Sequence, residues 1–211
     1  MSHPWLEIPI ADYEAHMALS SVGQAQLLST TLQRTVAEFQ PLSLAVLGVA
    51  GGNGLDAVER ALVHRVVALD FNADYLALCS RRYASAFDAF EPVLHDLSHG
   101  PPAIAPVECV FAGLVLEYLR VESFCDYLAS LLTPAGSFVA LLQLPSPTLP
   151  EISPSPFRSL TRLESAFRFV EPSRLHDCLS AHGFSRIAAD QYDLEYGKSF
   201  HYASYRVPNA A

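Results

Sequence analysis

Short, almost wholly hydrophobic runs alternate along this chain with segments whose apolar residues recur at helical spacing. The hydrophobic runs predict five strands, at about 44–50, 65–70, 92–95, 108–113 and 137–143. The segments between them predict helices that follow Leu55, that run from the N-cap Asn72 to about Ala84, and that cover 121–132. Apolar strands that alternate with helices are typical of a parallel sheet covered on both faces, so we expect an α/β fold.

The two ends of the chain extend this pattern. Residues 11–39 predict two short helices ahead of the first strand. Residues 145–158 are rich in proline and are expected to form an ordered loop rather than a helix or a central strand. A short helix over 159–167 and another from Glu171 to His182 follow, and then strands over 184–195 and 199–207. These last two strands are close in sequence and predict an antiparallel hairpin.

The first strand ends in a glycine-rich turn, LAVLGVAGGNGLD over 44–56, and the second strand ends on Asp70. A strand, a glycine-rich turn, a helix and a strand with a terminal carboxylate form one nucleotide-binding half of a doubly wound fold. The glycines allow backbone to approach a ligand, and Asp70 can accept both hydroxyls of a ribose. The turn has neither the dinucleotide-binding spacing nor a P-loop motif. The alternative interpretation is a glycine-rich turn without a ligand.

Composition narrows the class of ligand. The chain has 211 residues, 51% of them hydrophobic and 17% charged, with 13 Lys and Arg and a net charge of −9. Such an acidic chain is poorly suited to phosphate backbones, so we expect a small-molecule partner and no nucleic acid. We find no apolar run of transmembrane length, no signal peptide, no metal-binding cluster and no C-x-x-C among four cysteines, and we expect a cytoplasmic protein. A homodimer stays open.

The segment 46–54 resembles motif I of the class I S-adenosylmethionine (SAM) dependent methyltransferases, hydrophobic-acid-x-G-x-G-x-G. Two positions depart from it, because the acid falls on Gly48 and the first glycine on Ala50. The resemblance covers about 41–207 and implies SAM as the cofactor. It also implies a doubly wound Rossmann-like methyltransferase fold with a parallel sheet, an antiparallel C-terminal hairpin and an N-terminal helical lid. We expect the lid over 1–40 and the SAM-binding unit over 41–207, within one domain.

The same resemblance assigns cofactor-binding residues. The turn around the methionine and the ribose is assigned to Gly48, Ala50, Gly51, Gly52, Asn53 and Gly54. Asp70 is assigned to the ribose hydroxyls and Phe71 to the adenine ring. Asp96 is placed at the adenine amino group and Leu97 at the ring, although Asp96 could simply cap a turn. Carbonyls near Ala112 and Gly113 are placed close to the methionine amine.

Methyl transfer requires alignment, shielding from water and, for some acceptors, removal of a proton. The candidate bases are His16, Glu117, His176 and His201. We select Tyr13, His16 and Glu117 as catalytic candidates, with packing in the lid as the alternative for the first two and a solvated helix residue for Glu117. The C-terminal aromatic residues are expected to line an apolar acceptor pocket or to contact the sulfonium; they are Tyr192, Tyr196, Phe200, Tyr202 and Tyr205.

Three functions follow from the resemblance. The first is methyl transfer to a small metabolite or natural-product intermediate. The second is closure of SAM's own amino-acid chain into azetidine-2-carboxylate with release of methylthioadenosine, as in a group of methyltransferase-like enzymes. The absence of the motif I acid at Gly48 favours it, because an amine without an acidic partner loses its proton more easily. The third is a non-catalytic, SAM-binding regulatory protein.

Overall fold

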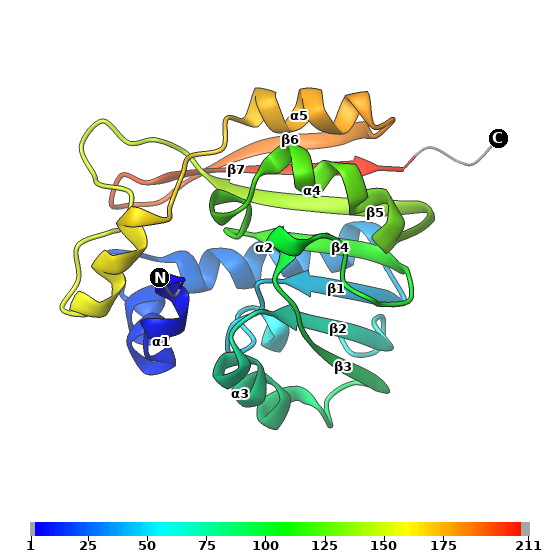
Figure 1. Cartoon of the computed structure of the whole chain (residues 1–211), viewed down its shortest axis with the longest axis horizontal. Coiled ribbons are helices and arrows are strands. Elements are labelled where there is room, and N and C mark those ends of the chain that lie inside the picture. The colour runs from blue at the N-terminus through cyan, green and yellow to red at the C-terminus, as the bar shows by residue number, and fades with distance from the viewer. Residues whose placement is uncertain (1–2, 208–211) are drawn as a thin grey trace.

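Seven strands pair in the order β3-β2-β1-β4-β5-β7-β6 in the computed structural model, which describes residues 3–207 (Figure 1). Their bounds are β1 Ser43–Leu47, β2 Arg65–Asp70, β3 Ala89–Leu94, β4 Val107–Gly113, β5 Leu132–Gln143, β6 Ser185–Asp193 and β7 Ser199–Arg206. Strands β1 to β5 are parallel, and β7 is antiparallel to both β5 and β6. The predicted doubly wound sheet with an antiparallel C-terminal hairpin is therefore confirmed. Its strand order reverses between β1 and β4, where such sheets bind their ligands.

Helices cover both faces of the sheet. The α-helices are α1 Ile10–Ala18, α2 Gln24–Phe39, α3 Ala73–Tyr83, α4 Val121–Leu128 and α5 Pro172–Ala181. Leu44 and Val46 of β1 belong to the core under α2 and α3, and Ala45 and Leu47 to the core under α4 and α5. This alternation buries both sides of β1, which explains its uninterrupted apolar sequence. No helix within residues 3–207 is long and apolar enough to cross a membrane.

The prediction of a helix after Leu55 is wrong. Only a single 3-10 turn, η2 Leu55–Ala57, follows the glycine-rich turn, and an irregular segment leads to β2. Helix α2 lies against this place: a Cβ on Gly54 would be 3.3 Å from both the Leu28 carbonyl oxygen and Leu32 Cδ2. Because α2 precedes β1 in the chain and already covers this part of the sheet, a second helix is not needed there.

The segment 133–136, between the predicted helix over 121–132 and the predicted strand over 137–143, belongs to β5. Helix α4 ends at Leu128, a 3-10 turn (η5 Ala129–Leu131) follows, and β5 starts at Leu132. Val107 pairs with Leu132 but Cys109 pairs with Ser137, so the residues between are a bulge in the ladder. Ala135 has a φ of 59° there. A bulge tolerates proline, and the turn-like sequence TPAG reflects it.

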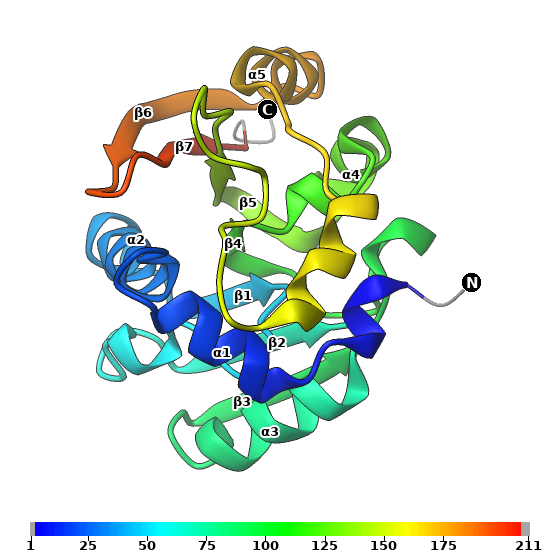
Figure 2. The same cartoon turned by 90° about the vertical axis from the view of Figure 1, so that its left-hand side faces the viewer.

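The N-terminal segment and the chain after β5 meet at the carboxyl ends of the parallel strands (Figure 2). The N-terminal segment consists of η1 Pro4–Glu7 and α1, and its neighbour is the 3-10 helix η6 Arg158–Ser165. Ser159 donates a 2.6 Å hydrogen bond to Asp12, and Arg162 pairs with Glu7 at 2.6 Å. The proline-rich segment forms an irregular connection over 144–157 between β5 and η6, as expected apart from residue 158, which begins η6. The N-terminal segment and the chain between β5 and the end of η6 together cover the carboxyl ends of the parallel strands.

Candidate active site

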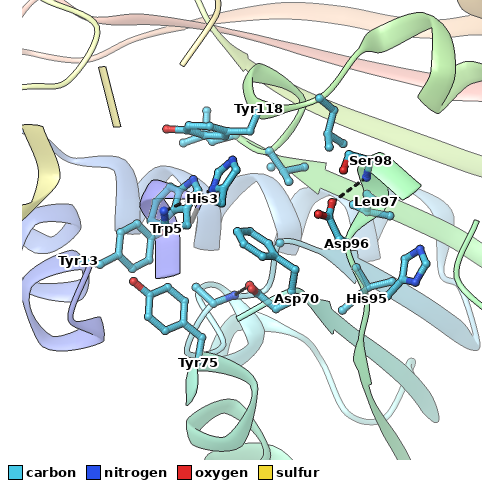
Figure 3. Close-up of a pocket in the computed structure, with 18 residues that line it drawn as sticks. His3, Trp5, Tyr13, Asp70, Tyr75, His95, Asp96, Leu97, Ser98 and Tyr118 are labelled. Carbon is cyan, nitrogen blue, oxygen red and sulfur yellow. Dashed lines mark hydrogen bonds between the residues drawn. The ribbon is translucent and has the colours of Figure 1, made fainter. Parts of the chain in front are cut away.

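A cavity of about 220 Å³ lies at the carboxyl ends of the strands, and we call it the cofactor cavity (Figure 3). Its lining comes from the glycine-rich turn, the ends of β2, β3 and β4, and the N-terminal segment. The lining residues include His3, Trp5, Tyr13, Gly48, Ala50, Asp70, Phe71, Tyr75, Asp96, Leu97, Gly113, Leu114, Val115 and Tyr118. The cavity thus occupies the point where the strand order reverses, which is the expected ligand site of this architecture.

Aromatic rings form one wall of the cofactor cavity. Trp5 packs edge-on against Tyr13, Tyr75 and Tyr118, at centroid distances of 5.2, 6.5 and 5.4 Å. We call these four residues the aromatic cluster. Asn72 Nδ2 donates a 3.0 Å hydrogen bond to the Trp5 carbonyl, and the Tyr75 hydroxyl donates a 2.7 Å bond to the carbonyl of Ile8. These bonds attach the N-terminal segment to the start of α3 and hold Trp5 over the cavity.

Asp70, at the end of β2, joins the second strand to the glycine-rich turn. Its carboxylate accepts hydrogen bonds of 2.8 Å from the backbone amides of Ala50 and Asn72. Burial raises the pKa of Asp70, and the backbone hydrogen bonds oppose that effect. Because a carboxylate offers about four acceptor positions, it retains capacity for a ligand.

The glycine-rich turn divides into residues that line the cavity and residues that pack behind it. Gly48 and Ala50 line it, whereas Gly51 to Gly54 do not. A Cβ on Gly51 would overlap the Glu14 carboxylate, and one on Gly52 would overlap the Tyr83 ring. Asn53 also faces the protein, since its Nδ2 donates a 2.9 Å hydrogen bond to the Tyr13 hydroxyl.

Gly48 stands where motif I has an acid, and the space that an acidic side chain would need there is occupied by Val115. A Cβ on Gly48 would lie 2.8 Å from Cγ2 of Val115, in the loop after β4. Gly48 also has a φ of 64°, in the left-handed region that glycine tolerates best. An acidic side chain at this position would require Val115 to move.

Four more of the predicted cofactor-binding residues line the cavity, Phe71, Asp96, Leu97 and Gly113, while Ala112 does not. Asp96 also accepts a 2.9 Å hydrogen bond from the Ser98 amide and caps the 3-10 helix η3 Leu97–His99. Asp96 therefore caps a helix, as the alternative interpretation expects, and also lines the cavity.

Sequence reasoning missed several lining residues. They are His3, Tyr75, Leu114, Val115 and Tyr118, besides His95, Ser98 and Leu119. None belongs to a glycine-rich or acidic motif. Tyr75 and Tyr118 follow strand ends by a few residues, and that position is the one signal that could have identified them.

A smaller chamber of about 50 Å³ adjoins the cofactor cavity, and we call it the second chamber. The two share Trp5, Tyr13, Leu114 and Tyr118. The rest of its lining includes His16, Met17, Gln24, Glu117, Gln143, Ile152, Leu160, Leu163 and Phe167. The three catalytic candidates, Tyr13, His16 and Glu117, therefore come together here.

Glu117 and His16 are polar groups in a mostly apolar place. Glu117, on the 3-10 helix η4 Leu116–Tyr118, is 1% exposed, so the alternative of a solvated helix residue is wrong. Its Oε1 accepts a 2.7 Å hydrogen bond from the Gln143 amide, and burial raises its pKa to about 7. Burial first, and then the charge of Lys198, lower the pKa of His16. Glu117 can therefore exchange a proton near neutral pH, and the lowered pKa of His16 favours its neutral form, which can accept a proton.

Other candidates lie elsewhere. Neither His176 nor His201 lines the two cavities. The C-terminal aromatic residues do not line them either, which corrects the expected acceptor pocket: Phe200, Tyr202 and Tyr205 are at most 1% exposed and fill the core. Alternation along β7 turns these large rings toward the helices on both faces of the sheet. Within the described part of the chain, no group of three or more His, Cys, Asp or Glu could hold a metal ion.

No protein-family model and no curated protein sequence matches this chain. Solved structures do match. The N-methyltransferase NodS from Bradyrhizobium japonicum WM9, in complex with S-adenosylhomocysteine (SAH), is 12% identical over 88% of each chain, with a TM-score of 0.66. Magnesium protoporphyrin IX methyltransferase ChlM from Synechocystis PCC 6803, with bound SAM, is 14% identical over 88% of this chain and 80% of that one, with a TM-score of 0.63.

A third similar structure is the [4+2]-cyclase SpnF, which is 13% identical over 85% of this chain and 82% of its own, with a TM-score of 0.62. At such identities the likeness lies in the architecture. It spans most of the chain in each comparison, including the sheet whose strand ends form the cofactor cavity. The chain therefore has the Rossmann-like fold of the class I SAM-dependent methyltransferases.

Proposed function

We propose that this protein is a SAM-dependent enzyme that transfers a methyl group to a small metabolite or natural-product intermediate. The observation that carries the proposal is the pair of adjoining cavities. One lies at the ligand-binding point of the sheet, and the other holds two buried ionisable side chains. A donor and an acceptor could meet at the aromatic cluster between them.

The cofactor cavity offers groups suited to each part of SAM. The remaining acceptor positions of Asp70 suit the ribose hydroxyls, and Phe71 offers a ring for the adenine. Asp96 can accept from the adenine amino group, beside the backbone of Leu97. Gly48 and Ala50 on one side and Gly113 on the other leave room for the methionine portion. The bound SAM and SAH of the NodS and ChlM structures support this assignment.

SAM supplies an electrophilic methyl group on a positively charged sulfur. The protein's part is to align the acceptor, exclude water and remove a proton. Three members of the aromatic cluster, Trp5, Tyr13 and Tyr118, line both cavities, where aromatic rings can stabilise a cation. Glu117 or His16 takes the proton that the acceptor loses when the new carbon bond forms and the carbon–sulfur bond breaks.

A second candidate, cyclisation of SAM, is favoured by the contact of Gly48 with Val115. That contact leaves no room for the acid expected at the methionine ammonium. In this reaction the amine nitrogen of SAM attacks its own γ carbon, the carbon–sulfur bond breaks and methylthioadenosine leaves. Glu117 would receive the proton. The reaction for which SpnF is named, a [4+2] cyclisation, supports the view that this fold is used for more than methylation.

Product analysis distinguishes the candidates. The purified protein is incubated with SAM alone, and then with SAM and a mixture of small acceptors, and products are identified by mass spectrometry. SAH that forms only with an acceptor supports methyl transfer. Methylthioadenosine and azetidine-2-carboxylate from SAM alone would replace it with the cyclase. SAM that binds but stays unchanged in both incubations would leave the regulatory protein.

A further inference from the structure

Two buried polar atoms of the second chamber have no hydrogen-bond partner within residues 3–207: Oε2 of Glu117 and Nδ1 of His16. Their residues are 1% and 4% exposed. A buried polar group without a partner is costly, and such groups are rare in folded proteins. Because both residues line the same chamber, a ligand that bears hydrogen-bonding groups would satisfy them together.

Two other polar side chains of this chamber, those of Gln24 and Gln143, are already paired. Gln24 Nε2 donates to Oε1 of Gln143 at 3.1 Å, and Gln143 Nε2 donates to the carbonyl of Glu151 at 2.8 Å. Among the residues that line this chamber, Glu117 and His16 are therefore the ones with a buried side-chain atom that has no partner within residues 3–207.

Glu117 also lacks a countercharge. It has no ion pair among the described residues. The nearby buried cation, Lys198, donates instead to the Glu151 carbonyl at 2.6 Å and to Gln143 Oε1 at 3.3 Å, and it does not line the chamber. Since an unpaired buried carboxylate is strongly unfavourable, a cationic ligand suits Glu117 better than a neutral one.

The remaining lining is mostly apolar, with Glu151 and Ser153 as its polar members. Met17, Leu160, Leu163 and Phe167 come from α1, η6 and the residues after it. An occupant therefore needs a short hydrophobic body opposite its polar end, and the volume of about 50 Å³ limits its size.

We propose that the second chamber binds a small aliphatic amine, with its nitrogen held by Glu117 and His16 and its hydrocarbon part against Met17, Leu160 and Leu163. That the amine is the methyl acceptor rests on the proposed function, whereas its binding to the second chamber does not. The ammonium first gives a proton to the Glu117 carboxylate. The neutral nitrogen then attacks the methyl carbon, the carbon–sulfur bond breaks with its electrons on sulfur, and an N-methylated ammonium and SAH result.

The test compares isobutylamine with isobutanol, which has a hydroxyl in place of the amino group. Binding is followed by NMR titration at pH 8, with and without saturating SAH. We expect the amine to bind at least tenfold more tightly than the alcohol. Glu117→Gln should remove this preference while leaving SAH affinity unchanged. Glu122→Gln, which alters an exposed glutamate of α4, is the matched control and should keep the preference.

A second variant, His16→Asn, tests the other residue that is proposed to hold the nitrogen. It keeps the proposal testable if Glu117→Gln does not fold. Equal binding of amine and alcohol, or a preference that survives Glu117→Gln, would overturn the proposal. A wild-type protein that binds isobutylamine but neither SAM nor SAH would overturn the proposed function and leave the amine site standing. If SAH binds and the amine does not, the reverse holds.

Discussion

The backbone amide of Gln143, the last residue of β5, donates a 2.7 Å hydrogen bond to Oε1 of Glu117 and leaves Oε2 unpartnered within the described chain. The end of a central strand thus fixes one oxygen of a buried carboxylate in the short helix after β4. The other oxygen is left to a ligand or to a proton.

Glu117→Gln should stabilise the protein increasingly as the pH rises. Burial raises the pKa of Glu117 to about 7 from a usual value of 4.5, so folding favours the protonated form. The stabilisation from this proton is complete below about pH 4.5 and is lost as the pH rises through 7. The variant should gain up to about 3 kcal/mol relative to wild type between these limits.

Chemical unfolding of both proteins at pH 5 and pH 8 measures this difference. A gain from the substitution that is the same at both pH values would show that Glu117 keeps an ordinary pKa in the folded protein. The amide oxygen of the introduced glutamine can still accept the hydrogen bond from Gln143, so that contact does not confound the comparison.

Gly52→Ala should destabilise the fold more than Gly100→Ala. Both glycines have a positive φ, 102° and 101°, so alanine is strained at each position, at a cost of about 1–3 kcal/mol. A Cβ at position 52 meets the Tyr83 ring, whereas one at position 100 meets nothing within 4 Å. The overlap should add about 1–3 kcal/mol.

Denaturant unfolding measures both losses of stability. The double variant Gly52→Ala/Tyr83→Ala should lose less stability than the sum of the losses of its two single variants, because the overlap is gone once the ring is removed. Equal losses for the two alanine variants would mean that the Tyr83 ring moves aside at no cost. The positive φ would then be the remaining reason for a glycine at position 52.

The central strands β1, β2 and β4 could be predicted from the sequence because they bury both faces and are almost continuously apolar. The helix after Leu55 could not, because its absence depends on α2, which packs against Gly54 from an earlier part of the chain. Asp70 and Phe71 were identified by their place after a strand. Tyr75 and Tyr118 of the aromatic cluster were not, since their contacts with Trp5 join segments distant in sequence.

Asn72→Ser should loosen the N-terminal segment without weakening α3. Asn72 has two roles, because its Oδ1 caps α3 and its Nδ2 donates to the Trp5 carbonyl. Serine keeps the cap and loses the amide donor. Trp5 is the single tryptophan of the chain, so the protein's tryptophan fluorescence reports on this ring. In the variant, acrylamide should quench this fluorescence more strongly because the ring is more accessible.

Asn72→Ala is the comparison for this experiment, since it also removes the cap and should lower stability by about 1 kcal/mol. Quenching that is unchanged in both variants would mean that the bonds from α3 do not hold Trp5 in place. SAM and SAH should shield Trp5 from the quencher in the wild-type protein.

Truncation of one ring tests where the nucleoside binds. Phe71→Ala removes a ring that lines the cofactor cavity, and base-stacking contacts are worth about 1–3 kcal/mol. It should therefore weaken SAM binding roughly tenfold or more. Leu94→Ala is the control, because this exposed residue of the neighbouring strand end does not line the cavity.

Calorimetric titration of SAM into the wild-type protein and these two variants tests the central claim most directly. The account predicts saturable binding of one SAM per chain, weakened by Phe71→Ala and unchanged by Leu94→Ala. Folded wild-type protein that gives no saturable binding, or three proteins with the same affinity, would contradict a SAM site at the carboxyl ends of these strands.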